Sequence, residues 1–105
     1  MPIATREQFP LDAYVVDVLM RDLVGHDRSP AAFVVFMLLW RRARAERRPA
    51  PVRLSHQQIA DESGLSKSAV QQALRILHRR GLVSSTRRHR TDTPAHAVAR
   101  PWIRR

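Results

Sequence analysis

The stretch that decides the fold reads His56-Gln57-Gln58-Ile59-Ala60-Asp61-Glu62-Ser63-Gly64-Leu65-Ser66-Lys67-Ser68-Ala69-Val70-Gln71-Gln72-Ala73-Leu74. Two short helices that cross at a steep angle need a small residue at their contact and a turn residue that tolerates a positive φ. Ala60 and Gly64 supply these. Ile59, Leu65 and Val70 are spaced to fill the angle between the helices. The pattern predicts a helix-turn-helix, and the alternative is a helical corner in a protein that never meets DNA.

Two helices are predicted before this motif. The first covers residues 10–24, with proline at its start, apolar residues at helical spacing and Gly25 at its end. The second is capped by Ser29, contains ten consecutive apolar residues and continues into an arginine-rich end until Pro49 stops it. A helix that is apolar on every side is surrounded by protein. We therefore expect the second helix at the centre of the core.

The segments around and after the motif complete the predicted fold. Ser55 and Gln58 have the capping-box spacing, which predicts the first motif helix at 56–63, closed by Gly64. Ser66 is the expected N-cap of the second motif helix, which begins after it and runs to about residue 80, closed by Gly81. The predicted strands are an edge strand at 52–54 and a hairpin at 82–86 and 95–99, joined by an arginine-rich tip at 87–94. The predicted fold class is mainly α with a small β-hairpin (α+β), with an N-terminal helix added before the helix-turn-helix.

The charge of the chain is concentrated in its second part. The 105 residues carry 19 basic and 9 acidic side chains, a formal net charge of +10. Residues 1–40 hold three basic and five acidic side chains (net −2), and residues 41–105 hold 16 and four (net +12). Such asymmetry favours a nucleic acid or another anionic surface as partner of the basic part. The alternative is a solubilising surface in an arginine-rich protein, because 18 of the 19 basic residues are Arg.

Composition argues against several other classes of protein. The chain has no cysteine, which excludes a disulfide scaffold, a zinc-binding cysteine cluster and a thiol nucleophile. The ten-residue apolar run is about half of what a helix needs to span a bilayer. No arrangement of Ser, His and Asp predicts catalysis, and His89 and His96 alone do not predict a metal site. We expect a cytoplasmic protein without enzymatic activity, cofactor or metal.

The order of the predicted elements resembles the winged helix-turn-helix domains of bacterial regulators. The similarity to the GntR and MarR types, and to the DNA-binding domains of plasmid replication initiators, covers residues 30–103. It rests on Val52-Arg53-Leu54-Ser55 and on Leu74-Arg75-Ile76-Leu77-His78-Arg79-Arg80-Gly81-Leu82-Val83. These residues include neither the effector domain of a GntR protein nor the helix that follows the wing of a MarR protein. The resemblance implies a transcriptional regulator that binds double-stranded DNA, with one helix in the major groove and a basic wing on the backbone or minor groove.

Helix periodicity predicts which residues of the second motif helix face DNA. At about 100° per residue, Val70, Ala73, Leu74 and Leu77 lie together on one side of this helix. The opposite side is polar, and Gln pairs well with adenine and Arg with guanine. The predicted base-reading residues are Ser68, Gln71, Gln72 and Arg75. The alternative is that this face is simply solvated.

Basic and hydroxyl side chains near the motif are assigned to the DNA backbone. A helix N-terminus favours a phosphate, and the arginines of a wing reach a phosphate or the adjacent minor groove. The predicted backbone and wing contacts are Ser55, Gln57, Ser66, Lys67, Arg79, Arg87, Arg88 and Arg90. A further cluster either follows a flanking phosphate or lies far from the DNA; it consists of Arg41, Arg42, Arg44, Arg47 and Arg48.

The chain is divided into an N-terminal helical extension, residues 1–28, and a winged domain, residues 29–105. Val16 and Met20 give the extension more apolar surface than one stripe needs. We expect a homodimer formed by this helix and part of the central helix, and the alternative is that the helix only covers the core of a monomer. Two other functions stay open: a plasmid or phage replication initiator or partition protein, and a winged module for protein interactions. No residue pattern identifies a small-molecule effector.

Overall fold

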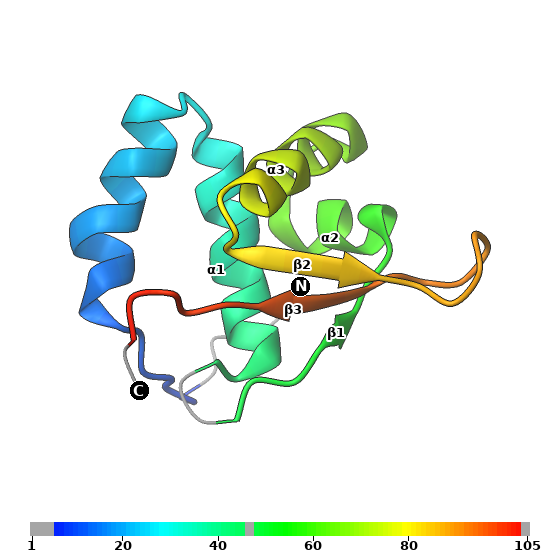
Figure 1. Ribbon diagram of the computed structural model, residues 1–105, viewed down its shortest axis with the longest axis horizontal. Helices are drawn as coiled ribbons and strands as arrows, with labels where there is room; N and C mark the ends of the chain where they lie inside the picture. The colour runs from blue at the N-terminus through cyan, green and yellow to red at the C-terminus, as the bar shows by residue number, and fades with distance from the viewer. Residues whose placement is uncertain (1–5, 46–47, 104–105) are drawn as a thin grey trace.

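Four helical regions and a three-stranded antiparallel sheet make up the computed structural model, which describes residues 6–45 and 48–103 (Figure 1). The element order is η1 (Val15–Leu19), η2 (Arg21–His26), α1 (Pro30–Ala43), β1 (Val52–Arg53), α2 (His56–Ser63), α3 (Lys67–Arg79), β2 (Val83–Thr86) and β3 (Ala95–Val98). The strand order is β1-β3-β2, and both pairs are antiparallel. The predicted fold class, an α+β winged helix-turn-helix with an added N-terminal helix, is confirmed.

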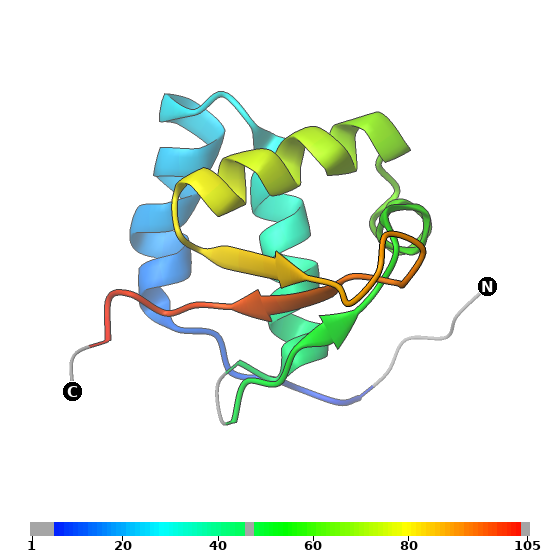
Figure 2. The same ribbon diagram turned by 45° about the vertical axis from the view of Figure 1, so that its right-hand side comes forward.

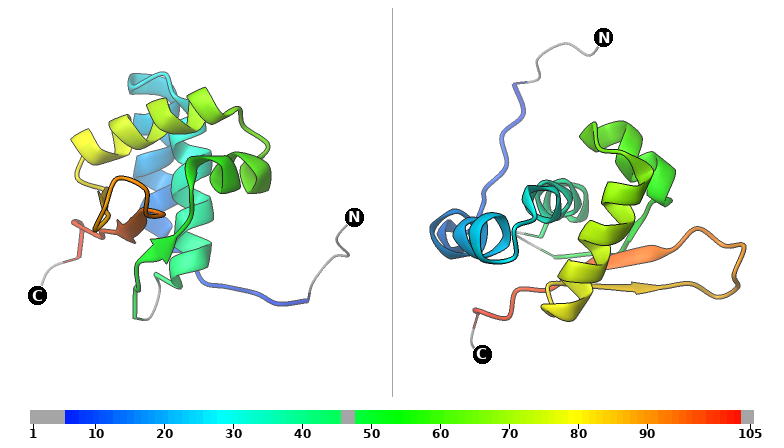
Figure 3. Two further views of the ribbon diagram at one scale, coloured as in Figure 1. Left: turned by 90° about the vertical axis from the view of Figure 1, so that its right-hand side faces the viewer. Right: turned by 90° about the horizontal axis from the view of Figure 1, so that it is seen from above.

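Helix α1 lies at the centre of the core, as its apolar sequence predicts. Val35, Phe36, Leu39 and Trp40 are fully buried. Figures 1 and 2 show the N-terminal helix beside α1 on one side, with α3 and the sheet on the other. Seen from above, the hairpin β2–β3 extends away from these helices as a wing (Figure 3). None of the described helices is long and apolar enough to cross a membrane.

The N-terminal helix differs from its prediction in hydrogen bonding and in length. The backbone N–H groups of Met20 and Asp27 donate to carbonyl groups five residues earlier, the pattern of a π-helix. Pro10 precedes the helix, and Gly25 lies inside η2 with no positive φ instead of ending it. In a helix whose hydrogen bonds span five residues, side chains that are four positions apart in the sequence lie on nearly the same face. Val15, Leu19 and Leu23 are therefore buried together, a spacing that also fits an α-helix.

The arginine-rich end of α1 is shorter than predicted. The helix starts at its expected N-cap, where the Ser29 hydroxyl accepts a hydrogen bond from the Ala32 N–H. It ends at Ala43 and not near residue 48, because Arg44 takes a left-handed conformation with φ 52°. The N–H of Ala45 then bonds the Trp40 carbonyl, and Ala45 is fully buried. Because Ala45 is buried, the chain turns back towards the core before Pro49.

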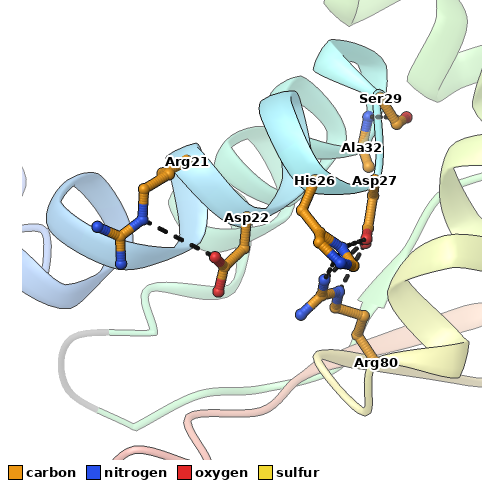
Figure 4. A network of polar contacts seen from close by, with 7 residues as sticks. All are labelled: Arg21, Asp22, His26, Asp27, Ser29, Ala32 and Arg80. Carbon is orange, nitrogen blue, oxygen red and sulfur yellow. Dashed lines mark hydrogen bonds and ion pairs between the residues drawn. The ribbon is translucent and has the colours of Figure 1, made fainter.

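Ion pairs fix the N-terminal helix to the basic part of the chain. At its end, Asp27 accepts hydrogen bonds from Nε and Nη2 of Arg80 at 2.6 and 2.7 Å, and His26 lies 2.9 Å from the same carboxylate (Figure 4). The side-chain hydrogen bonds from Arg80, and then that from His26, hold the pKa of Asp27 well below its usual range. Before the helix, Asp12 accepts hydrogen bonds from Arg100 and Trp102. Two of the arginines that make the chain basic are thus structural.

Candidate nucleic-acid interface

The turn between α2 and α3 has the geometry that the sequence predicts. The Ser55 hydroxyl accepts from the Gln58 N–H at 3.1 Å, and the Gln58 side chain accepts from the Ser55 N–H at 2.8 Å, so the capping box is complete. Gly64 caps α2 with φ 84°. Ile59 and Ala60 of α2 are buried, and α2 packs against both α3 and α1. This contact fixes how α3 projects from the domain.

Helix α3 presents one polar face to solvent. Its buried residues are Val70, Ala73, Leu74, Ile76 and Leu77, which include the predicted four. Of the predicted base-reading residues, Ser68, Gln72 and Arg75 are exposed and Gln71 is half-buried. Arg79 is also exposed. The face is available to a ligand, and its exposed side chains can both donate and accept hydrogen bonds.

A shallow hollow of about 260 Å³ lies between the start of α2, the start of α3 and the wing. Five of the predicted backbone contacts line it together: Ser55, Gln57, Lys67, Arg87 and Arg90. The wing tip is shaped by its own hydrogen bonds, because Nη1 of Arg87 donates to the Arg90 carbonyl at 2.8 Å and the His89 N–H donates to Asp92. Three segments far apart in sequence thus meet here, and two of them bring the positive charges of Lys67, Arg87 and Arg90 together, next to the carboxylate of Asp92.

Other predicted backbone residues have structural partners or lie outside this hollow. The Ser66 hydroxyl caps α3 by accepting from the Ala69 N–H at 3.1 Å. The Gln57 side chain also donates to Asp61 at 2.9 Å. Arg88 is exposed near the wing tip but does not line the hollow. Arg79, the last residue of α3, does not line it either.

The arginine cluster near the end of α1 is partly neutralised. Arg41 pairs with Glu7 at 2.8 Å, and Arg42 pairs with Glu62 at 2.6 Å, which links the ends of α1 and α2. Arg44 and Arg48 are exposed, and Arg47 lies outside the described residues. None of the described members of the cluster lines the hollow beside α3, which weakens the interpretation of this cluster as a DNA contact.

A chain of hydrogen bonds between α3 and the sheet was missed by sequence reasoning. His78 Nε2 lies 2.7 Å from the Ser85 hydroxyl, which lies 2.7 Å from His96 Nδ1, and His96 Nε2 lies 2.9 Å from the Leu54 carbonyl. His96 is 1% exposed, and its burial lowers its pKa. Burial, followed by the nearby charge of Arg87, also lowers the pKa of His56. The register of the hairpin, which sets Ser85 opposite His96, is the feature that could have revealed this contact.

A comparison with known families identifies the winged part of the chain. The model of the Crp-like helix-turn-helix domain matches residues 34–94. The chain belongs to the Crp-like helix-turn-helix domain family. The Crp-like segment begins inside α1 and continues through the wing tip to the start of β3, so the N-terminal helix is outside it.

Membership of the Crp-like family shows that this is a DNA-binding helix-turn-helix domain, with DNA as its partner. The resemblance to GntR and MarR regulators and to replication initiators is not confirmed by this match. No curated protein and no solved structure matches the chain significantly. Within the described residues, no group of three or more His, Asp or Glu side chains is placed to hold a metal ion.

Proposed function

We propose that this chain binds double-stranded DNA at specific sequences and regulates transcription, with α3 in the major groove and the wing on the backbone or adjacent minor groove. The observation that supports this is the polar face of α3 beside the basic hollow between α2, α3 and the wing. A helix fits the major groove, and phosphate contacts on both sides hold it in register. The chain would act by binding and not as an enzyme, in the cytoplasm of a bacterium.

The roles of the site residues follow from their position. Gln71, Gln72 and Arg75, with Ser68 at the start of α3, are proposed to read base edges because their amide and guanidinium groups match adenine and guanine. Phosphates are proposed to bind along the rim of the hollow and at the end of α3. The residues assigned to them are Ser55, Gln57, Ser66, Lys67, Arg79, Arg87, Arg88 and Arg90.

Selection of bound sites from a random duplex library, followed by titration of variants, tests this proposal. Gln72→Ala and Arg75→Ala should each relax preference at one base pair, at a cost of about 1–3 kcal/mol on the selected site. Arg88→Ala should weaken all sequences alike and reduce the salt slope by about one. Ile103→Ala, at an exposed position that lines no part of the basic hollow, is the control.

Three results would separate the proposal from its alternatives. If neither α3 variant nor Arg88→Ala changes DNA affinity, the assignment of recognition helix and wing is wrong. Binding to random duplex no tighter than that of a charge-matched control protein would indicate a module for protein interactions. Selected sites that recur as repeats beside a replication origin would indicate a replication initiator or partition protein.

We further propose that the chain forms a homodimer through its N-terminal helical extension, residues 1–28, together with part of α1, and that residues 29–105 are the DNA-binding domain. Val16, Met20 and Val24 are 38–44% exposed although they follow one another at four-residue spacing on the N-terminal helix. The stripe is symmetrical about Met20, so an antiparallel second copy would set Val16 against Val24. Asp17 and Arg21 lie beside the stripe, and the same pairing brings these opposite charges together across the interface.

Sedimentation of the chain at a concentration of tens of micromolar tests the dimer. This concentration suits the micromolar affinity expected of a modest interface. The wild-type chain should sediment as a dimer and Met20→Glu as a monomer. Ile103→Glu introduces the same charge at an equally exposed apolar side chain elsewhere and should leave the dimer intact. A monomeric wild-type chain would show that the helix only covers the core.

A further inference from the structure

The hydrogen-bond chain between α3 and the sheet fixes which nitrogen of the buried His96 carries a proton. The Leu54 carbonyl can only accept, so His96 Nε2 is the donor across their 2.9 Å contact. In the neutral ring, His96 Nδ1 therefore has a lone pair. The Ser85 hydroxyl, 2.7 Å away, must donate to that lone pair.

The same logic continues to the surface at His78. Because the Ser85 hydrogen is directed to His96, its oxygen is left to accept, and His78 Nε2 must be the donor at 2.7 Å. His78 thus keeps a proton on Nε2 and is left with Nδ1, which bonds no described residue. A proton added there creates a cationic ring with a free N–H without breaking any bond of the chain.

Of the two histidines, His78 can be charged while every donor and acceptor of the chain keeps its role. A proton on His96 Nδ1 would remove the acceptor of the Ser85 hydrogen, and the Ser85 oxygen would then have to accept from that ring as well. His96 is buried with no carboxylate partner, whereas His78 is exposed in the last turn of α3, where the helix dipole favours a cation. His78 is therefore the ring that can take a proton without disturbing the hydrogen-bond chain.

The surroundings of His78 have the chemistry of an anion site. A hollow of about 240 Å³ between α3 and the wing is lined by His56 of α2, His78 of α3, Arg87 after β2 and His96 of β3. Arg75 and Arg79 lie on the same helix, and no carboxylate lines the hollow. It shares His56, Arg87 and Pro94 with the larger hollow at the start of α2 and α3. The charge of Arg87, joined by that of His78 when its ring is protonated, would attract a phosphate here.

We propose that His78 is a contact to a DNA backbone phosphate that forms on protonation, and that Ser85 and His96 are positioning residues that hold its ring. This inference rests on the proposed DNA binding. A phosphate beside Nδ1 favours the protonated ring, so DNA binding takes up a proton and tightens as the pH falls. Histidine is the side chain whose charge changes between pH 5 and 8.

Titration of the full chain with its selected duplex between pH 6 and 8, at constant ionic strength, tests the proposal. Uptake of one proton changes affinity by up to tenfold per pH unit, and the wild-type chain should bind about tenfold more tightly at pH 6 than at pH 8. His78→Gln and Ser85→Ala should each reduce that gain by about threefold or more. Ser85→Thr keeps the hydroxyl and should therefore show the gain in affinity of the wild-type chain. His26→Gln, at the Asp27 ion pair away from the wing, should leave the gain unchanged.

The outcomes distinguish this inference from the function on which it rests. A gain that persists in full in His78→Gln, with DNA still bound, overturns the role of His78 and leaves DNA binding in place. Failure of the wild-type chain to bind duplex at pH 6 and low salt overturns the proposed function itself. Imidazole NMR gives a second readout that needs no DNA: His96 should be the Nε2–H tautomer, and an Nδ1–H tautomer would contradict the hydrogen-bond chain.

Discussion

Replacing Asp27 by Asn should lower the free energy of unfolding by about 2–3 kcal/mol at pH 7. The carboxylate is 11% exposed and accepts two short hydrogen bonds from Arg80, which is 29% exposed. Hydrogen bonds to charged groups contribute about 1.5–3 kcal/mol each. Two such bonds together would give about 3–6 kcal/mol, and the expected cost lies below this range because Arg80 keeps some contact with water and regains more in the variant.

The cost of Asp27→Asn should depend on pH in one direction. The pKa of Asp27 is depressed in the folded state, first by the hydrogen bonds from Arg80 and then by His26. The carboxylate therefore stabilises the fold fully above the unfolded pKa of about 3.9, and this contribution is lost as the pH falls towards the folded pKa. The difference between wild-type and variant should be constant from pH 7 to 5 and shrink below pH 4.

Urea denaturation at pH 7, 5 and 3 measures this difference. Asp17→Asn is the matched control, because Asp17 is on the same helix with an exposed side chain and should cost less than about 0.5 kcal/mol. Combination with Arg80→Met should cost less than the sum of the single changes. A cost of Asp27→Asn below about 0.5 kcal/mol, or one that does not shrink in acid, would refute the view that this ion pair holds the N-terminal helix on the domain.

Two further predictions concern the helix-turn-helix and are measured by the same denaturation. Gly64→Ala should cost about 1–2 kcal/mol, because φ is 84° and a Cβ there meets no atom within 4 Å, so that only backbone strain acts. Gly25→Ala, with equal space but no positive φ, should be neutral or stabilising, and an equal loss at both positions would contradict this account. Ser66→Ala removes the N-cap of α3 and should cost about 1 kcal/mol, whereas Ser68→Ala, which leaves the cap in place, should be nearly neutral.

Elements with local signals could be predicted from the sequence. Ser29, Ser55 and Ser66 were read as N-caps from their neighbours alone, and each caps its helix as expected. Helix ends that depend on contacts with residues distant in the sequence could not be predicted. The N-terminal helix continues to His26, and the residue after it is held by Arg80, 53 positions later. Its hydrogen-bond pattern was hidden because spacing by four fits both an α-helix and a π-helix.

The same distinction applies to the candidate site, where some features follow from local sequence and others need the tertiary structure. The polar face of α3 follows from helix periodicity, because the buried and exposed sides of one helix are set by its own sequence. The basic hollow needs tertiary structure, since Ser55, Lys67 and Arg87 come from three segments. The link from His78 through Ser85 to His96 was missed because its members lie on three separate elements, so that no periodicity within one element brings them together.

The strand order β1-β3-β2 leaves β2 at the outer edge of the sheet, next to the wing arginines. An open edge is a template on which another chain can add a strand and begin to aggregate. Strand β2 is only four residues long and runs directly into Arg87 and Arg88, and a second copy paired along it in parallel would set these charges side by side. The wing arginines thus oppose parallel strand addition at this edge at times when no polyanion covers them.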